Sequence, residues 1–219
     1  MTAGPTAFLR DADETEAFAK AFGILCKGGE RLALKGEMGA GKTTFVRGLA
    51  AGLGIESHEI SSPTFTLIHV HDGQGDEAHS RRCLVHVDAY RLEDQSELED
   101  LGWSELLQEQ RNVVVVEWPQ KIAGSLGDSV FEMELFHAIS GSDGQTGREL
   151  VFNSTLPGEL KRQLFTSCRT CQRQLHAGLS SFPFCGNTCR MADLGNWFDG
   201  NYSVSREIEE DDLFDSDLS

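Results

Sequence analysis

The stretch Gly36-Glu37-Met38-Gly39-Ala40-Gly41-Lys42-Thr43 decides the fold of this chain. It fits the pattern G-x-x-x-x-G-K-[ST] of the phosphate-binding P-loop. Residues 31–35 before it predict a short strand, and residues 42–53 after it predict a helix that ends at two glycines. Glycines let successive backbone N–H groups point inward at a phosphate, and the helix adds the positive end of its dipole. The pattern therefore predicts an α/β nucleotide-binding fold, with a chance glycine-rich turn as the alternative.

The P-loop gives two residues a role and requires an acidic partner. Lys42 would reach the β- and γ-phosphates of ATP, and the Thr43 hydroxyl would coordinate Mg²⁺. A second strand usually brings a carboxylate beside the loop, and two expected strands end on one, at Asp88 and at Glu117. The sequence does not decide between the two acids, because ligands of α/β sheets gather at the carboxyl ends of strands and both positions qualify. Thr64, in a polar turn, is a candidate sensor of the γ-phosphate, or else an ordinary turn threonine.

Composition limits the class of protein. The 219 residues are 39% hydrophobic and 25% charged, which is typical of a soluble globular chain of one domain, or one domain and a small module. No apolar run approaches the roughly 20 residues that span a bilayer, and residues 1–5 show no secretory signal, so a cytoplasmic location without membrane contact is expected. The net charge of −16 argues against direct nucleic-acid binding by the molecule as a whole.

Hydrophobic patterns predict the remaining elements. A β-branched run at 112–117 is long enough for a buried strand, and a hairpin is expected from 129–138 to 149–153. Further strands are expected at 6–10, 67–70 and 83–88, and further helices at 13–27, 97–110 and 156–165. Composition changes after this point, which predicts a domain at 1–155, a linker helix at 156–166, a second module at 167–206 and a disordered acidic tail at 207–219.

The second module contains four of the six cysteines. Cys168 and Cys171 form C-x₂-C, and Cys185 and Cys189 form C-x₃-C thirteen residues later. Such spacing indicates a structural zinc site in a module that has little core without the metal. A redox pair or unpaired thiols are the alternatives. His176 is a possible substitute ligand, although it reads more simply as a loop histidine; Cys26 and Cys83 read as small buried hydrophobes.

Four segments together produce a resemblance over about residues 5–155. They are GEMGAGKTT at 36–44, SSPTF at 61–65, HVDAYRL at 86–92 and EWP at 117–119. In this order and spacing they resemble the bacterial TsaE family, an ATPase that is needed for threonylcarbamoyladenosine formation in tRNA and works with the TsaB and TsaD proteins. The resemblance implies a mixed sheet, with central parallel strands flanked by antiparallel ones and helices on its faces.

The same resemblance implies roles for individual residues. Lys42 binds phosphate, and Thr43 and Glu117 form the Mg²⁺ site. Asp88 assists or positions water, and Thr64 belongs to a switch loop. Residues expected to contact the nucleotide are those of the P-loop with Thr44, and also Trp118 and Thr15, which match family positions near the nucleotide and near the base.

A second resemblance covers about residues 166–206. FPFC at 182–185 and CRMADLGNW at 189–197 resemble the YacG family of small zinc proteins, described as inhibitors that bind the B subunit of DNA gyrase. The sequence thus favours a partner-coupled ATPase fused to a zinc module. A gyrase-directed regulator with a secondary ATPase domain is one alternative. A small-molecule kinase is another, which the arginine-poor segment 72–82 disfavours, since such kinases usually carry an arginine-bearing lid.

Overall fold

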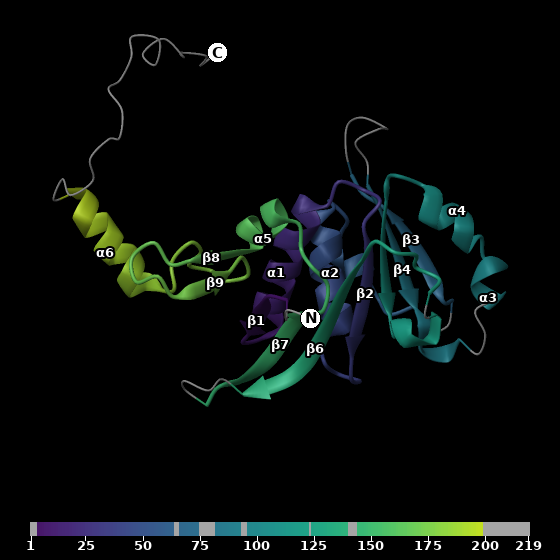
Figure 1. The fold of residues 1–219 in the computed structure, drawn as a ribbon, viewed down its shortest axis with the longest axis horizontal. Helices are drawn as coiled ribbons and strands as arrows, with labels where there is room; N and C mark the ends of the chain where they lie inside the picture. The colour runs from purple at the N-terminus through teal and green to yellow at the C-terminus, as the bar shows by residue number, and fades with distance from the viewer. Residues whose placement is uncertain are drawn as a thin grey trace, which may run out of the picture.

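The computed structural model describes residues 4–63, 66–74, 82–92, 96–122, 124–139 and 144–198 (Figure 1). A seven-stranded sheet has the order β1-β7-β6-β2-β5-β4-β3. The inner strands β6, β2, β5 and β4 run parallel, and the flanking pairs β6–β7, β7–β1 and β4–β3 are antiparallel. The strands are β1 (Thr6–Leu9), β2 (Arg31–Gly36), β3 (Ile68–Asp72), β4 (Cys83–Asp88), β5 (Asn112–Glu117), β6 (Val130–Ile139) and β7 (Thr146–Phe152). The predicted mixed α/β sheet is therefore confirmed.

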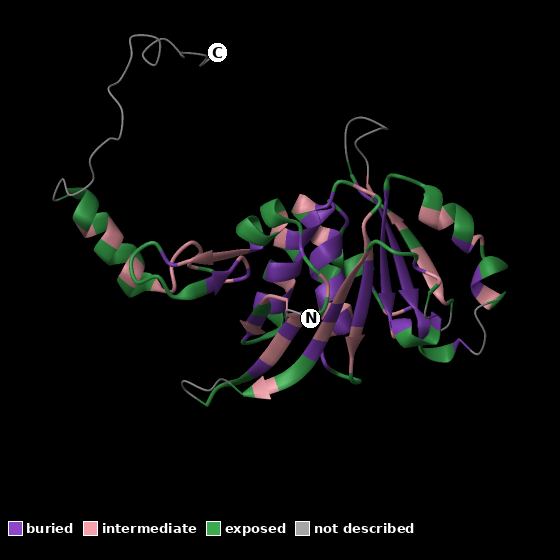
Figure 2. Ribbon diagram, viewed as in Figure 1, coloured by how far each residue is buried: buried purple, intermediate pink, exposed green. Residues whose placement is uncertain are grey.

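Both faces of the sheet are covered, which explains the continuous apolar runs. All six residues of β4 and all six of β5 are buried (Figure 2). One core lies under α1 (Ala12–Leu25) and α2 (Lys42–Gly52), with Phe18, Phe22 and Phe45 at its centre. The other lies around Trp103 of α4 (Trp103–Gln108) and Leu98 of α3 (Ser96–Glu99). The short helices η1 (Ser57–Glu59), η2 (Ala89–Arg91) and η3 (Pro119–Ile122) follow α2, β4 and β5.

The first two helices pack closely because glycines face the neighbouring backbone. A Cβ at Gly48 of α2 would lie 2.3 Å from the carbonyl oxygen of Glu16 in α1. Real Cβ atoms essentially never come this close, so no side chain fits at this position without movement of a helix. This contact holds the helix that follows the P-loop against the core.

One predicted helix is wrong in its extent. Residues 97–110 form two short helices, α3 and α4, rather than one. Gly102 has a φ of 76° and caps the N-terminus of α4. Its left-handed conformation breaks the hydrogen-bond ladder, and the reversal lets Leu98 and Trp103 both enter the same core.

The C-terminal part contacts the sheet domain through α1. It consists of α5 (Gly158–Leu164), a two-stranded sheet of β8 (Phe165–Ser167) and β9 (Gln174–His176), and α6 (Asn187–Phe198). In Figure 1 these elements lie on the side of α1, away from β3 and β4. Phe165 packs on Phe18 with ring centroids 5.7 Å apart. The division at 156–166 stays a prediction, and the acidic tail 207–219 lies outside the described residues. Within the described ranges, no helix is long and apolar enough to cross a membrane.

Candidate nucleotide site and metal centre

A pocket of about 460 Å³ opens where β2, β4 and β5 end. The P-loop lies between the last residue of β2 and the first of α2. The pocket therefore collects residues of the loop and of the start of α2, together with the last residues of β4 and β5. Residues that line it are Met38, Gly39, Gly41, Lys42, Thr43, Thr44, Ser62, Asp88, Tyr90, Arg91, Glu117 and Trp118. Most of the predicted site residues therefore meet in one place.

The P-loop backbone adopts a conformation that its glycines allow. Gly39 and Gly41 have φ angles of 77° and 102°, in the left-handed region that side chains disfavour. Arg148 of β7 supports the loop from outside, because its Nε donates to the Ala40 carbonyl at 3.1 Å. The turn therefore presents its N–H groups and the start of α2 to the pocket.

Lys42 is held inside the site by three neighbours. Its Nζ donates to the carbonyl oxygens of Gly36 and Glu37, each at 2.9 Å. The same atom lies 4.0 Å from the centroid of the Trp118 ring, which packs against the Tyr90 ring at an angle of 53°. Burial lowers the pKa of Lys42, while the carboxylates of Glu117 and Asp88 act in the opposite direction. The ammonium group therefore stands between carbonyls, an aromatic face and two acids, ready for an anionic ligand.

The two acids left open by the sequence lie side by side. Asp88 and Glu117 are register partners on β4 and β5, and both are buried. The Thr43 hydroxyl donates to Glu117 Oε1 at 3.0 Å. Asp88 Oδ2 accepts from the Ser62 hydroxyl at 2.5 Å, and its Oδ1 accepts from the Tyr90 N–H at 3.1 Å. Glu117 is thus connected directly to the P-loop threonine, whereas Asp88 is connected to the Ser62 turn.

Four predicted contacts among the described residues fall outside the pocket lining, namely Gly36, Glu37, Ala40 and Thr15. Gly36 and Glu37 meet Lys42 only through their carbonyls, and Ala40 is buried beneath the loop. Thr15 is buried within α1, where its hydroxyl donates to the Asp11 carbonyl at 2.8 Å, and it does not line the pocket. Thr64 lies outside the described residues.

Sequence reasoning missed two supporting residues. Arg148 comes from β7, more than one hundred positions after the loop it supports, and no sequence signal connects the two. His86 is fully buried and places Nε2 3.0 Å from Glu117 Oε1. His86 is the first residue of the HVDAYRL segment. That segment could have drawn attention to it, but within the segment only Asp88 was assigned a role from the sequence.

Comparison with known proteins identifies the first part of the chain. Residues 9–145 match the family model described as "Threonylcarbamoyl adenosine biosynthesis protein TsaE". The chain belongs to the TsaE family. The Bacillus subtilis strain 168 relative is 39% identical over 143 residues, covering 65% of this chain and 80% of the relative. The Treponema pallidum relative is 38% identical over 126 residues, covering 58% of this chain and 87% of the relative. Both are named tRNA threonylcarbamoyladenosine biosynthesis protein TsaE.

A solved structure agrees with this family. The crystal structure of YdiB from Bacillus subtilis superposes with a TM-score of 0.51 at 31% sequence identity. The match covers 69% of this chain and 86% of YdiB. The predicted resemblance to the TsaE family is therefore confirmed. The family match ends at residue 145 and does not include the C-terminal part of the chain.

Four cysteines form a candidate metal centre beyond the TsaE part. The sulfur atoms of Cys168, Cys171, Cys185 and Cys189 all lie within 4.8 Å of one another. Sulfurs around a tetrahedral zinc ion, each about 2.3 Å from the metal, are separated by about 3.8 Å. The shortest separations here, 3.4 and 3.5 Å, are close to that value. The donor set thus fits zinc, and residues 166–215 match the family model described as "DNA gyrase inhibitor YacG".

The surroundings of Cys168 favour the thiolate that a metal requires. Burial acts to raise its pKa, but hydrogen bonds from the backbone N–H groups of Cys171, Cys185 and Thr170 outweigh it and lower the pKa to about 6. The N–H of Cys185 lies 3.4 Å from the Cys168 sulfur. A ligand that loses its proton near neutral pH binds the metal with little cost.

His176 is neither a zinc ligand nor a loop residue, which corrects the reading from the sequence. It lies on β9, is buried, and its Nε2 is 2.9 Å from the Phe8 carbonyl of β1. Its Nδ1 accepts from the Gly178 N–H at 3.2 Å, so Nε2 carries the hydrogen that is donated to Phe8. Burial lowers its pKa, while Glu14 acts to raise it. His176 therefore joins the TsaE-family domain to the C-terminal part.

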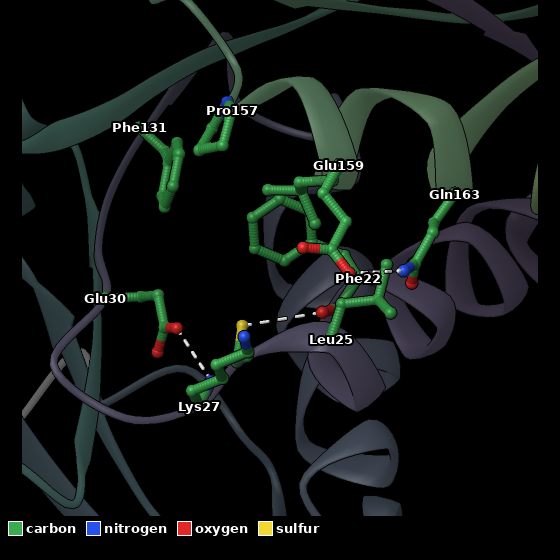
Figure 3. Close-up of a pocket in the computed structure, with 10 residues that line it drawn as sticks. Phe22, Leu25, Lys27, Glu30, Phe131, Pro157, Glu159 and Gln163 are labelled. Atoms are coloured by element: carbon green, nitrogen blue, oxygen red, sulfur yellow. Dashed lines mark hydrogen bonds between the residues drawn. The ribbon is translucent and has the colours of Figure 1, made fainter.

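A smaller cavity of about 230 Å³ lies between the end of α1, the start of β6 and α5 (Figure 3). Phe22, Leu25, Phe131 and Pro157 line it, together with the charged residues Glu30 and Glu159. The lining includes Cys26, whose pKa is raised mainly by burial, which confirms it as a small buried hydrophobe. Cys83 is likewise buried. This cavity offers packing rather than a reactive group.

Proposed function

We propose that this chain is the ATP-binding and ATP-hydrolysing component of the system that forms threonylcarbamoyladenosine in tRNA. Its partners would be TsaB- and TsaD-type proteins. Membership of the TsaE family supports this role. The observation that carries it is the pocket, where Lys42, Thr43, Asp88 and Glu117 converge.

The residues of the pocket divide the binding of ATP among them. The P-loop N–H groups and the start of α2 would hold the β- and γ-phosphates, and Lys42 would exchange its two carbonyl partners for phosphate oxygens. Trp118 and Tyr90 would close the side of the pocket. Thr64 would belong to a loop that closes over the γ-phosphate.

The metal ligands proposed are Thr43 and Glu117, whose oxygen atoms are of the kind that Mg²⁺ prefers. Mg²⁺ held there would offset the negative charge of the phosphates. Thr43 donates its one hydroxyl hydrogen to Glu117, so its oxygen lone pairs can face a cation. Asp88, held by Ser62 and the Tyr90 N–H, would fix the position of the attacking water together with Glu117.

Hydrolysis rather than phosphate transfer to a metabolite is the proposed reaction. The pocket lining contains one arginine, Arg91, whereas small-molecule kinases usually surround the transferred phosphate with several. Hydrolysis would reset the conformation of a partner complex. A screen for phosphorylated metabolites would detect kinase activity and contradict this part of the proposal.

The test is steady-state ATP hydrolysis by the full-length protein, alone and with its TsaB- and TsaD-type partners. We expect stimulation by the partners and loss of about two orders of magnitude or more in Lys42→Ala. Lys35→Ala is the matched control, because Lys35 only pairs with Glu132 on the surface, at 3.1 Å. Absence of stimulation, or equal turnover in both variants, would contradict the proposal.

A second candidate function comes from the C-terminal part, which we propose as a structural zinc module for protein contact. The match to the YacG family supports it. In addition, α6 buries none of its residues and exposes Met191, Leu194, Trp197 and Phe198, which recur at helical spacing. Such a face suits a protein partner, and the B subunit of DNA gyrase is the candidate. Supercoiling assays with the full chain would show inhibition if this function is retained, and no inhibition would remove it.

A further inference from the structure

His86 lies behind the nucleotide pocket and has no role in the functions above. It is fully buried on β4, between Leu84 and Asp88 on the same face of the strand. Its register partner on β5 is Val115, and Glu117 is two residues further along. This diagonal relation brings Nε2 of His86 to 3.0 Å from Glu117 Oε1.

The hydrogen-bond roles around Glu117 follow from the groups present. An ionised carboxylate only accepts, so the Nε2 of His86 must carry the hydrogen. Thr43 Oγ1 donates to the same oxygen, also at 3.0 Å. Among the described residues, the hydrogen bonds to the Glu117 carboxylate both end on Oε1. Two donors of different origin, one from the sheet and one from the P-loop, therefore converge on one oxygen.

Convergence on one oxygen restricts how the carboxylate can rotate. The terminal torsion of a glutamate is broad and approximately two-fold, so a single hydrogen bond leaves the group free to exchange its oxygens. The donor on β4 belongs to a strand with all six residues buried, so it cannot follow such a rotation. Glu117 is thereby held where Thr43 can donate to it, which keeps the lone pairs of Thr43 directed at the cation position.

We propose that His86 is the positioning residue of this site, orienting Glu117 and, through it, the Thr43 hydroxyl for Mg²⁺. This inference rests on the proposed nucleotide function. His86 would not touch nucleotide or metal itself. Partners that orient metal-site carboxylates typically contribute 10- to 100-fold to metal affinity or activity.

The test measures ADP binding to the full-length protein by calorimetry, with and without Mg²⁺. We expect His86→Leu to weaken binding of ADP with Mg²⁺ by about 10-fold or more and to leave binding of ADP alone within about two-fold. His69→Leu is the matched control. His69 faces His86 in the register of β3 and β4, is only half-buried, and has no hydrogen bond to Glu117.

Two polar variants keep the inference testable if His86→Leu folds poorly. The amide nitrogen of His86→Gln reaches close to the position of Nε2, so affinity should return to within about three-fold of the natural protein. His86→Asn is one methylene shorter and should behave like His86→Leu. Equal affinities for the two amide variants would overturn the positioning role.

A double-mutant cycle with Glu117→Gln decides whether His86 acts through Glu117. If it does, His86→Leu adds little once Glu117 is changed. Additive losses, or the same loss with and without Mg²⁺, would overturn the inference. The calorimetric measurement includes no partner protein, so its result does not depend on whether partners stimulate hydrolysis. Conversely, if partners stimulate hydrolysis while His86→Leu binds ADP with Mg²⁺ as tightly as the natural protein, the role of His86 would be overturned and the proposed ATPase function would stand.

Discussion

The nucleotide pocket and the cysteine centre hold their functional groups in opposite ways. The pocket draws Lys42, Asp88 and Glu117 from three separate elements, and two apolar cores support those elements. The cysteine centre draws all its ligands from residues 168–189, and the adjoining α6 buries nothing. Tertiary packing therefore builds the first site, whereas the second has little core of its own, and we expect it to depend on a bound metal.

The largest effect should come from removing a zinc ligand. Cys171→Ser is expected to reduce bound zinc from one ion per chain to none and to unfold the region around β8 and β9, because structural zinc contributes about 10 kcal/mol to small modules. Elemental analysis and far-UV circular dichroism would measure this. Cys83→Ser is the control, since the Cys83 thiol lies outside the cysteine centre and donates to Asp72. Because the two sites are built separately, ADP binding should survive in Cys171→Ser. Loss of ADP binding together with loss of zinc would contradict this separation.

Overfilling the contact between α1 and α2 should have the next largest effect, and only on the TsaE-family domain. Gly48→Ala would place Cβ 2.3 Å from the Glu16 carbonyl and should cost about 3 kcal/mol of unfolding free energy. Urea unfolding followed by the fluorescence of the buried Trp103 would report it. Gly186→Ala, in the cysteine region, has nothing within 4 Å and should be nearly neutral. A similar loss of unfolding free energy in Gly48→Ala and Gly186→Ala would contradict the difference in packing between the two regions.

The contact between the two regions should be weaker and dependent on pH. His176→Leu removes the donor to Phe8 and should cost about 1 kcal/mol at pH 8. The pKa of His176 lies below its ordinary value of 6.5 in the folded protein, so the unfolded chain binds the proton first as pH falls. The stabilisation is therefore present above pH 6.5 and is lost below it. Denaturation of both proteins between pH 8 and pH 5 should show the difference shrinking, and a growing difference would contradict this.

The smallest effect on stability is expected at the exposed face of α6. Trp197→Ala should change unfolding free energy by less than about 0.5 kcal/mol, since the side chain is 64% exposed. If this face binds gyrase, the same change should abolish inhibition of supercoiling. Unchanged inhibition in Trp197→Ala would show that another surface is responsible.

Where a motif fixed local geometry, the sequence selected candidate residues that lie together in the structure. The P-loop, both strand-end acids and the four cysteines were found because short spacings encode them. The sequence did not reveal the order of the strands in the sheet. It therefore could not show that Asp88 and Glu117 are direct register partners. The link from Thr43 to Glu117 depends on that pairing, as does the position of His86.

Other residues could not be placed because tertiary contacts override local pattern. Arg148 supports the P-loop only because β7 lies two strands away from β2 in the sheet. His176 read as a loop residue, yet it becomes buried when β9 packs near β1. Gly102 divides a helix whose apolar positions looked continuous, since both halves must reach the core around Trp103.

The most direct test of the account is formation of threonylcarbamoyladenosine in tRNA by the reconstituted system. The natural chain would be compared with Lys42→Ala and Cys171→Ser, both supplied with the same TsaB- and TsaD-type partners, and the modified nucleoside measured by mass spectrometry. We expect Lys42→Ala to abolish the product and Cys171→Ser to retain most of it. Full activity of Lys42→Ala would contradict the central claim that this function depends on the P-loop pocket.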